Sequence, residues 1–489
     1  MDILTNETII KMRNLFLAIL LITIFYPAIA QKQSDNAFVT SPYLQIGSAP
    51  NASSLQLLWH ATDENSSWIV EHKTTAVSSW TNTGKPLATK ITTTGIAPHI
   101  VYRTALTGLV PGSTFTYRVL KNNKEVFSSQ AQAPRSADQP FRFVVFGDIG
   151  AGTPEAKQIA NGVYNAKADL VVVPGDIVYD YGLISEYRSR FWPIYNTDKV
   201  DSIGVPLMRS VPFVGAVGNH DADSRDLDKA PDALAYYHYW DQPLNGPVGK
   251  EGGAFVPVLT GSESNKKAFM QGAGNRYPRM TNFSFNYGNA HYTFLDADTY
   301  VDWTDKELTG WVTKDLADAK NAVWRFVVYH HPGFNSSREH FEQQQMRLLS
   351  PIFEAGKVDI VFNGHVHNYQ RSFPMRFAPD NKGTLLIGGK DSKSIRGRVI
   401  TGKWTLDKIF DGKTKTIPDG VIYIVTGAGG QNLYNPEQQN DPDSWQKFTD
   451  KFISTVHSFS VIDVNGKKLT LRQLTASGKE LDAIEITKQ

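Results

Sequence analysis

The stretch that decides the fold is FRFVVFGDIG, residues 141–150, in which a short apolar run ends in a polar turn. Four further segments have the same form, an apolar run followed by Asp, Asn or His: residues 169–176 (DLVVVPGD), 211–221 (VPFVGAVGNHD), 324–331 (WRFVVYHH) and 358–367 (VDIVFNGHVH). Runs of this length predict buried strands of an α/β sheet. Because ligands of open α/β sheets bind beyond the carboxyl ends of the strands, we expect the five polar ends to converge on one site.

The five strand ends carry oxygen and imidazole donors: Asp148, Asp176, Tyr179, Asn219, His220, His330, His365 and His367. This set is too large for one metal ion and suits two. The chain has no cysteine, so a metal must be held by oxygen and nitrogen atoms. Asp148 and Asp176 each follow a glycine at a strand end, and either carboxylate is a candidate to bridge two cations. His365 and His367 alternate, so they share a face on a strand but diverge in a loop.

Around these segments the chain alternates between helix and strand patterns. Asp148 and Asp176 lie 28 positions apart, enough for one crossover helix, expected at roughly residues 154–166, and the next parallel strand. Residues 37–130 instead contain short segments rich in β-branched and aromatic residues, separated by turn signals, which predict a small all-β sandwich. Residues 131–140 are polar, contain prolines and predict a linker to a second domain at residues 141–489, which carries the five strand ends.

The N-terminus predicts an export signal, removed after residue 30. Lys11 and Arg13 precede an apolar run at residues 15–26, and residues 28–30 have the small-x-small form of a cleavage site. The alternative is an uncleaved anchor. Cleavage would give a secreted or periplasmic protein, and no other segment is apolar enough to span a membrane.

The bulk composition excludes some partners. The chain of 489 residues carries a net charge of +2, which gives no indication of nucleic-acid or membrane-surface binding. Residues 376–418 contain ten Lys or Arg and four Asp or Glu. This stretch is either a solvated insertion or a rim that attracts anionic substrate. Residues 222–280 lack a strand pattern and form an excursion, whose aromatic residues 236–240 either pack in the core or belong to a lid.

Five motif blocks resemble those of the purple acid phosphatases, a branch of the binuclear metallophosphoesterases: residues 147–150 (GDIG), 175–179 (GDIVY), 218–221 (GNHD), 327–330 (VVYH) and 364–367 (GHVH). The match covers residues 141–371 in the family's order. The N-terminal sandwich is similar to that of the plant-type enzymes, and residues 106–117 resemble part of a fibronectin type III domain. The resemblance implies an α/β (α+β) class: a two-sheet sandwich flanked by helices (αββα), preceded by a small all-β fibronectin-like sandwich.

Each ligand position of the family is filled in this chain. The resemblance implies that Asp148, Tyr179 and His367 bind a first metal, ferric iron. It implies that Asn219, His330 and His365 bind a second, Fe(II), Zn(II) or Mn(II), with Asp176 bridging. Block 147–150 and Tyr179 favour this branch, because many related phosphoesterases have Asp-x-His in the first block and lack the tyrosine.

The resemblance further implies an acid phosphatase that hydrolyses phosphate monoesters of small substrates by attack of a metal-bound hydroxide. His220 follows the ligand Asn219 and is placed to assist the leaving group. His340 stands where the family carries an outer-sphere histidine. The alternatives are a phosphodiesterase on the same metals, and an inactive surface-binding protein, against which the intact ligand set argues. The oligomeric state stays open, because there is no cysteine for the intersubunit disulfide of some plant-type members.

Other polar residues have simpler interpretations. The histidines outside the blocks are expected to be structural: His60, His72, His99, His238, His291 and His457. His331 is expected to shape the turn with Pro332. Asp296 and Asp298 end another strand and either pack there or line the cleft. Tyr369 and Arg371 extend the last block and are expected to support it structurally.

Overall fold

The computed structural model describes residues 37–74, 79–380 and 399–489. The predicted export signal at residues 1–30 lies outside the described residues, as does part of the basic stretch, residues 381–398. Phe38 to Gln489 form one compact unit. Among the described residues, no helix combines the length and apolar character needed to cross a bilayer.

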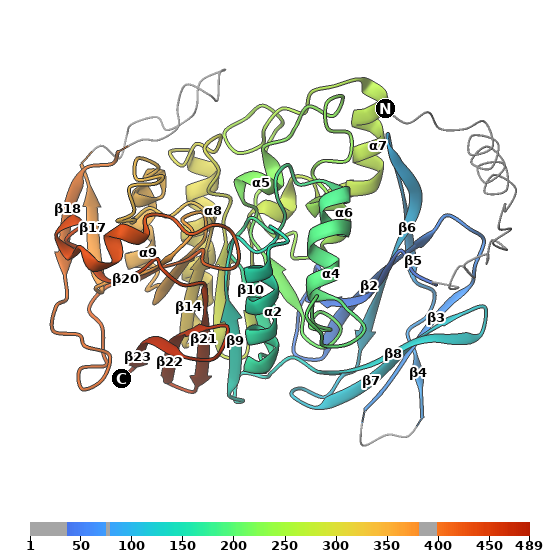
Figure 1. Ribbon diagram of the computed structural model, residues 1–489, viewed down its shortest axis with the longest axis horizontal. Coiled ribbons are helices and arrows are strands. Elements are labelled where there is room, and N and C mark those ends of the chain that lie inside the picture. Colours follow the sequence, from blue (N-terminus) through green and yellow to red (C-terminus); the bar gives the residue numbers. More distant parts are fainter. Residues whose placement is uncertain (1–36, 75–78, 381–398) are drawn as a thin grey trace, which may run out of the picture. The chain divides into compact units, whose positions relative to one another are not determined.

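Within the described part of the chain, ten strands form one mixed sheet (Figure 1). In spatial order they are β23 (Glu480–Thr487), β22 (Lys468–Thr475), β21 (Ser458–Asn465), β9 (Phe141–Val145), β10 (Leu170–Val173), β11 (Phe213–Gly215), β1 (Thr40–Gln45), β2 (Ser54–Thr62), β6 (Ile96–Thr107) and β5 (Leu87–Thr93). The central pairs β9–β10, β10–β11 and β11–β1 are parallel, whereas the outer pairs are antiparallel.

Seven of the described strands form a second sheet. Their order is β12 (Phe283–Tyr287), β13 (Ala290–Phe294), β14 (Trp324–Val328), β15 (Ile360–Asn363), β19 (Ile422–Thr426), β16 (Tyr369–Ser372) and β20 (Thr449–Ile453). The strands from β13 to β19 pair in parallel. The other described strands form two smaller antiparallel sheets. One has four strands, β4 (Thr81–Asn82), β3 (Trp68–Thr74), β7 (Thr114–Lys121) and β8 (Lys124–Gln132), and the other has two, β17 (Met375–Pro379) and β18 (Gly402–Leu406).

The two large sheets pack face to face because their strands alternate between two apolar cores. Phe143 and Val145 of β9 lie in the same core as Phe326 and Val328 of β14, between the sheets. The intervening Val144 faces the helices on the other side. Since each fully buried aliphatic or aromatic side chain contributes roughly 1.5–3 kcal/mol, the continuous apolar runs specify burial on both faces.

Helices cover the outer faces of both sheets. Ile159, Ala160 and Val163 of α2 pack against the first sheet, and Leu308 and Val312 of α8 pack against the second. The α-helices among the described residues are α2 (Pro154–Ala166), α3 (Ile184–Glu186), α4 (Trp192–Tyr195), α5 (Asn219–Ala222), α6 (Tyr236–Tyr239), α7 (Glu263–Ala273), α8 (Lys306–Asp318) and α9 (Ser350–Ala355). The order helix, sheet, sheet, helix confirms the expected fold class.

Short helical turns join several of these elements. They are the π-helical η1 (Tyr187–Phe191) and the 3₁₀ turns η2 (Gly274–Arg276), η3 (Arg279–Thr281), η4 (Ala319–Asn321), η5 (Gln345–Leu349), η6 (Pro436–Asn440) and η7 (Pro442–Ser444). In the chain after Gly420, η6 and η7 stand between β19 and β20.

The N-terminal region is all-β, as expected, and shares a sheet with the chain after residue 141. Gln45 of β1 pairs with Phe213 of β11, so β1, β2, β6 and β5 extend the ten-stranded sheet. Between Gln132 and Phe141 the chain forms neither helix nor strand. The division into domains at residues 131–140 stays a prediction.

The excursion at residues 222–280 contains no strand among its described residues, as expected, but it includes α7, which the sequence analysis missed. Tyr236, Tyr237, Tyr239 and Trp240 are buried in the same core as α2. The aromatic cluster is therefore core packing rather than a lid.

Candidate metal centre

The five polar strand ends meet at one place. Asp148, Asp176, Asn219, His330 and His365 stand just beyond the ends of β9, β10, β11, β14 and β15, which belong to both large sheets. One ligand atom of each of Asp148, Asp176 and His330 lies within 4.8 Å of the others. The sheet edges thus bring together residues more than two hundred positions apart.

A first group surrounds Asp148. The hydroxyl of Tyr179 donates to Asp148 Oδ1 at 3.1 Å and lies 3.4 Å from His367 Nε2. His367 Nε2 is also 3.4 Å from Asp148 Oδ1. A phenol, a carboxylate and an imidazole therefore point at one another.

A second group surrounds His330. Its Nε2 lies 3.2 Å from Asp176 Oδ1 and 3.1 Å from Asn219 Oδ1. The ring centroid of His365 is 5.0 Å from that of His330. Asp176 lies between the two groups, because it contacts His330 and belongs to the same close set as Asp148. All seven residues expected as metal ligands are thus in one cluster.

The backbone conformation aims these side chains inward. Asp148, Asp176 and His365 have φ of 61°, 51° and 67°, in the left-handed region that non-glycine residues adopt rarely and mainly at functional sites. At Gly150 a Cβ atom would lie 2.0 Å from the carbonyl oxygen of Ile177. The loops after β9 and β10 therefore touch, and only glycine fits at this contact.

Each of the three imidazoles donates a hydrogen bond from one ring nitrogen to a group outside the cluster. Nδ1 of His330 donates to the carbonyl oxygen of Pro174, and Nδ1 of His367 donates to that of Asn432, both at 2.8 Å. His365 uses the other nitrogen: its Nε2 donates to Gln343 Oε1 at 2.5 Å. These bonds leave Nε2 of His330 and His367, and Nδ1 of His365, as the free lone pairs. His365 and His367 diverge from their shared loop.

Burial and the neighbouring charges shift the pKa values of the ionisable groups in the cluster. Asp148 and Asp176 are 0% and 1% exposed. Burial opposes ionisation of Asp176, but His330 and His220 outweigh it and hold its pKa below the usual range. Burial also opposes protonation of His330, but Asp176 raises its pKa to about 9. Burial raises the pKa of Tyr179 well above the usual range, and Asp148 and Asp176 raise it further.

These donors fit cations. Among the described residues, no Lys or Arg forms an ion pair with Asp148 or Asp176. Histidines are therefore the cationic partners that the described residues offer to these two buried carboxylates, and metal ions would replace that compensation when the imidazoles bind as neutral ligands. Carboxylate, phenol, amide and imidazole donors without any thiol suit iron, zinc and manganese.

The two histidines expected to act in catalysis border the cluster. His220 Nδ1 donates to the carbonyl oxygen of Asp180 at 2.8 Å, and its Nε2 lies 3.9 Å from Asp176 Oδ2. The ring centroid of His340 is 4.0 Å from that of His365. His220 thus adjoins Asp176, whereas His340 adjoins the second group.

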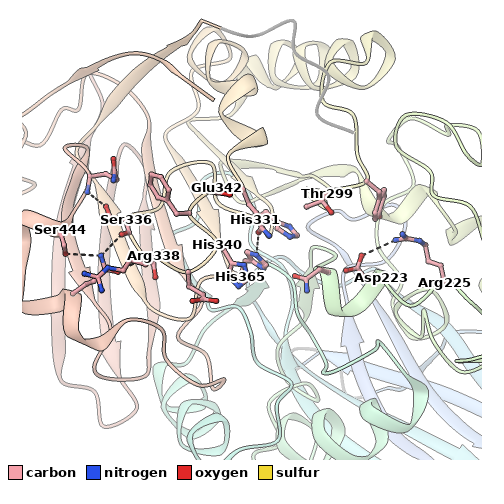
Figure 2. A pocket seen from close by; sticks show the side chains of 18 residues that line it. Asp223, Arg225, Thr299, His331, Ser336, Arg338, His340, Glu342, His365 and Ser444 are labelled. Atoms are coloured by element: carbon pink, nitrogen blue, oxygen red, sulfur yellow. Dashed lines mark hydrogen bonds and ion pairs between the residues drawn. The ribbon is translucent and has the colours of Figure 1, made fainter. Parts of the chain in front are cut away.

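A cavity of about 890 Å³ opens beside the second group, and Asn219 and His365 form part of its lining. Figure 2 shows the three central histidines between two polar walls: His331, His340 and His365, with Asp223 and Arg225 on one side and Ser336, Arg338 and Ser444 on the other. The cavity can admit a substrate group larger than phosphate next to the cluster.

Tyr434 and His331 contact the cluster in ways that the sequence analysis did not predict. Tyr434 stacks on His367 at a centroid distance of 4.1 Å. His331, expected only to shape a turn, packs its ring 4.0 Å from His365, and its Nδ1 lies 3.5 Å from Asp298 Oδ1. No local sequence signal marks Tyr434, but the strand-ending position of Asp298 was visible.

Residues 141–369 match the family model described as "Calcineurin-like phosphoesterase", and this part of the chain belongs to that class of phosphoesterases. Relatives include "Probable inactive purple acid phosphatase 27" of Arabidopsis thaliana, 26% identical over 64% of this chain and 53% of the relative. "Purple acid phosphatase 1" of Ipomoea batatas is 30% identical over 48% of this chain and 44% of the relative. Within that class, these relatives make the chain similar to the purple acid phosphatases.

The fold agrees with a solved member of that family. A purple acid phosphatase from seeds of yellow lupin, Lupinus luteus, superposes with a TM-score of 0.61 at 17% identity, covering 92% of this chain and 74% of the lupin chain. The chain spans about half the length of the two sequence relatives. The likeness to the lupin structure concerns the fold alone. An activity must therefore be inferred from the geometry of the cluster.

Proposed function

We propose that the protein is an exported hydrolase, secreted or periplasmic, that cleaves small phosphate monoesters at a binuclear metal centre. The observation that carries this proposal is the convergence of Asp148, Asp176, Tyr179, Asn219 and three imidazoles into two adjoining donor groups. Nucleic-acid substrates are not expected, because the net charge is only +2.

Each donor group would hold one ion. Asp148, Tyr179 and His367 would bind the first, and Asn219, His330 and His365 the second, with Asp176 shared between them. Ferric iron is proposed for the first position, because only a strongly Lewis-acidic ion would ionise a phenol whose pKa burial holds so high. Fe(II), Zn(II) or Mn(II) is proposed for the second.

When bound, the two cations offset the negative charge of the phosphate group and lower the pKa of water. The protein's own residues then orient the substrate and supply a proton. Nδ1 of His220 is fixed by Asp180, which leaves Nε2 on the side of Asp176. Burial lowers the pKa of His220, but Asp176 and the carbonyl of Asp180 raise it above the usual range overall. Nε2 of His220 is therefore placed to supply the proton that the leaving alcohol needs.

Replacing His220 with Ala is expected to reduce kcat by about 10²-fold for substrates with poor leaving groups, because general acid catalysis contributes roughly that much. Metal content should be unchanged, since His220 is not among the proposed ligands. Steady-state kinetics with alkyl and nitrophenyl phosphates checks this expectation. His457→Ala, which removes a histidine bonded to the carbonyl of Gln431, is the control. An unchanged kcat for the alkyl phosphates would refute this role.

Metal removal and substrate choice test the function itself. A chelator should abolish hydrolysis, and iron with zinc should restore it. Monoesters should be cleaved faster than diesters. Faster cleavage of diesters would favour the alternative, a phosphodiesterase on the same metals.

An inactive surface-binding protein is the alternative of another class, and the name of the Arabidopsis relative keeps it relevant. That alternative predicts no turnover of any phosphate ester by the metal-loaded protein. Against it stands the complete set of seven donors.

A further inference from the structure

The three cluster imidazoles donate hydrogen bonds to two kinds of acceptor, backbone carbonyl oxygens and a side-chain oxygen. His330 and His367 donate to backbone carbonyl oxygens, of Pro174 and Asn432, which no substitution of those residues' side chains removes. His365 alone of the three donates to a side chain, Gln343. Its orientation therefore depends on the identity of one residue.

The rings around His365 do not fix that orientation by themselves. His331 and His340 each place their ring centroid 4.0 Å from that of His365, which restrains the tilt of the ring. An imidazole turned by 180° about its Cβ–Cγ bond has nearly the same shape, so packing barely distinguishes the two orientations. A directional hydrogen bond from Nε2 does distinguish them.

The segment around Gln343 is held in place by its neighbours. Gln344 accepts a hydrogen bond from the backbone of Ile400 at 3.1 Å, and its Nε2 donates to the carbonyl of Phe341 at 2.8 Å. Gln345 Nε2 donates to the carbonyl of Ala297 at 3.1 Å. Gln343 is thus presented from a fixed backbone, and it lines the same cavity as His340.

We propose that Gln343 is a positioning residue for the second metal. Its Oε1 keeps the proton of His365 on Nε2, so the lone pair stays on Nδ1, the ring nitrogen that Gln343 does not contact. It also links the cavity wall that carries His340 to the metal centre. This inference rests on the proposed function, because it concerns the ion assigned to Asn219, His330 and His365.

Gln343→Leu is the direct test, because leucine has a similar size but no acceptor. We expect the dissociation constant for Zn²⁺ at the second position to rise about 10- to 100-fold, the usual effect of losing the outer partner of a metal-binding histidine. Gln343→Glu keeps an acceptor and should stay within about threefold of the wild type. Gln446→Leu is the matched control: the same change, in the same cavity, where the side chain has no imidazole partner among the described residues.

Calorimetric titration of the metal-free protein with Zn²⁺ gives the dissociation constants. The ¹⁵N chemical shifts of the imidazoles in the metal-free protein give the tautomer without any activity measurement. We expect the proton of His365 on Nε2 in the wild type and in Gln343→Glu, and a mixture of tautomers in Gln343→Leu. If Gln343→Leu does not fold, Gln343→Asn, whose amide is one methylene shorter, carries the same expectation.

The outcomes separate the two claims. A wild type that binds no second ion overturns the proposed function. A wild type that binds two ions, together with a folded Gln343→Leu variant of equal affinity and the same tautomer, overturns the inference alone. A Gln343→Glu variant as weak as Gln343→Leu also overturns it, because Gln343 would then be acting as a donor.

Discussion

Replacing Asp176 with Asn is expected to remove the bound metals and to lower kcat by about 10³-fold or more. The carboxylate of Asp176 lies between the two donor groups. Its Oδ1 is 3.2 Å from His330 Nε2, and a ligand atom of Asp148 lies within 4.8 Å of it. Loss of a single group that stabilises charge in the transition state already costs roughly 10²–10³-fold. An asparagine at this position would be nearly isosteric but neutral, so it cannot offset two cations.

The measurement is metal content per chain by atomic spectroscopy, together with steady-state hydrolysis of a phosphate monoester. Asp223→Asn is the control, because its side chain is 61% exposed, lines the same cavity and pairs only with Arg225 among the described residues. The control should keep both metals and most activity. Wild-type turnover by the Asp176→Asn variant would contradict the assignment of the bridging residue.

Replacing Arg371 with Met is expected to lower the free energy of unfolding by about 3–5 kcal/mol, the cost of leaving buried charges without a partner. Arg371 and Asp482 are each 7% exposed. Nε and Nη2 of Arg371 donate to both carboxylate oxygens of Asp482, at 2.7 and 3.1 Å, and Nη1 donates to Asp450 at 2.6 Å. These bonds connect β16 and β20 of the second sheet to β23 of the first.

The pH dependence follows from the same pair. Burial opposes ionisation of Asp482, but the hydrogen bond and charge of Arg371 outweigh it and hold the pKa of Asp482 below the usual range. A folded-state pKa below the unfolded value of about 3.9 means that the stabilisation is present above that pH. It is lost as the pH falls through the lower folded value.

Urea unfolding at neutral pH and near pH 3 checks both points. The difference between wild type and Arg371→Met should be large at neutral pH and smaller in acid. Arg338→Met, which removes an exposed ion pair with Glu437, should change stability by less than about 0.5 kcal/mol. A loss below about 1 kcal/mol for Arg371→Met at neutral pH would show that the pair does not hold the sheets together. The sequence indicated only that Arg371 supports the last block.

The sequence could predict the elements whose signals are local. The crossover helix was expected at residues 154–166 and is α2, Pro154–Ala166. Its start is set by Thr153, whose side chain accepts from the backbone of Ala156, and by Pro154 in the first turn. The five strand ends could be predicted for the same reason, because an apolar run and the polar residues after it are adjacent in the chain.

Features that depend on distant pairing could not be predicted. β1 pairs with β11, although nothing in the sequence of either strand indicates the other as its partner. The carbonyl oxygens of Pro174 and Asn432 anchor two imidazoles, and a backbone atom leaves no signature in the side-chain pattern. Gln343 is one of three consecutive glutamines, and only the fold distinguishes the one that faces His365.

The most direct test of the central claim is anomalous diffraction from crystals of the metal-loaded protein, recorded at the iron and zinc absorption edges. We predict two peaks about 3.5–4 Å apart, the separation of two-metal sites. One should lie among Asp148, Tyr179 and His367, the other among Asn219, His330 and His365, and both should contact Asp176. A single peak, or two peaks that do not share Asp176, would contradict the account.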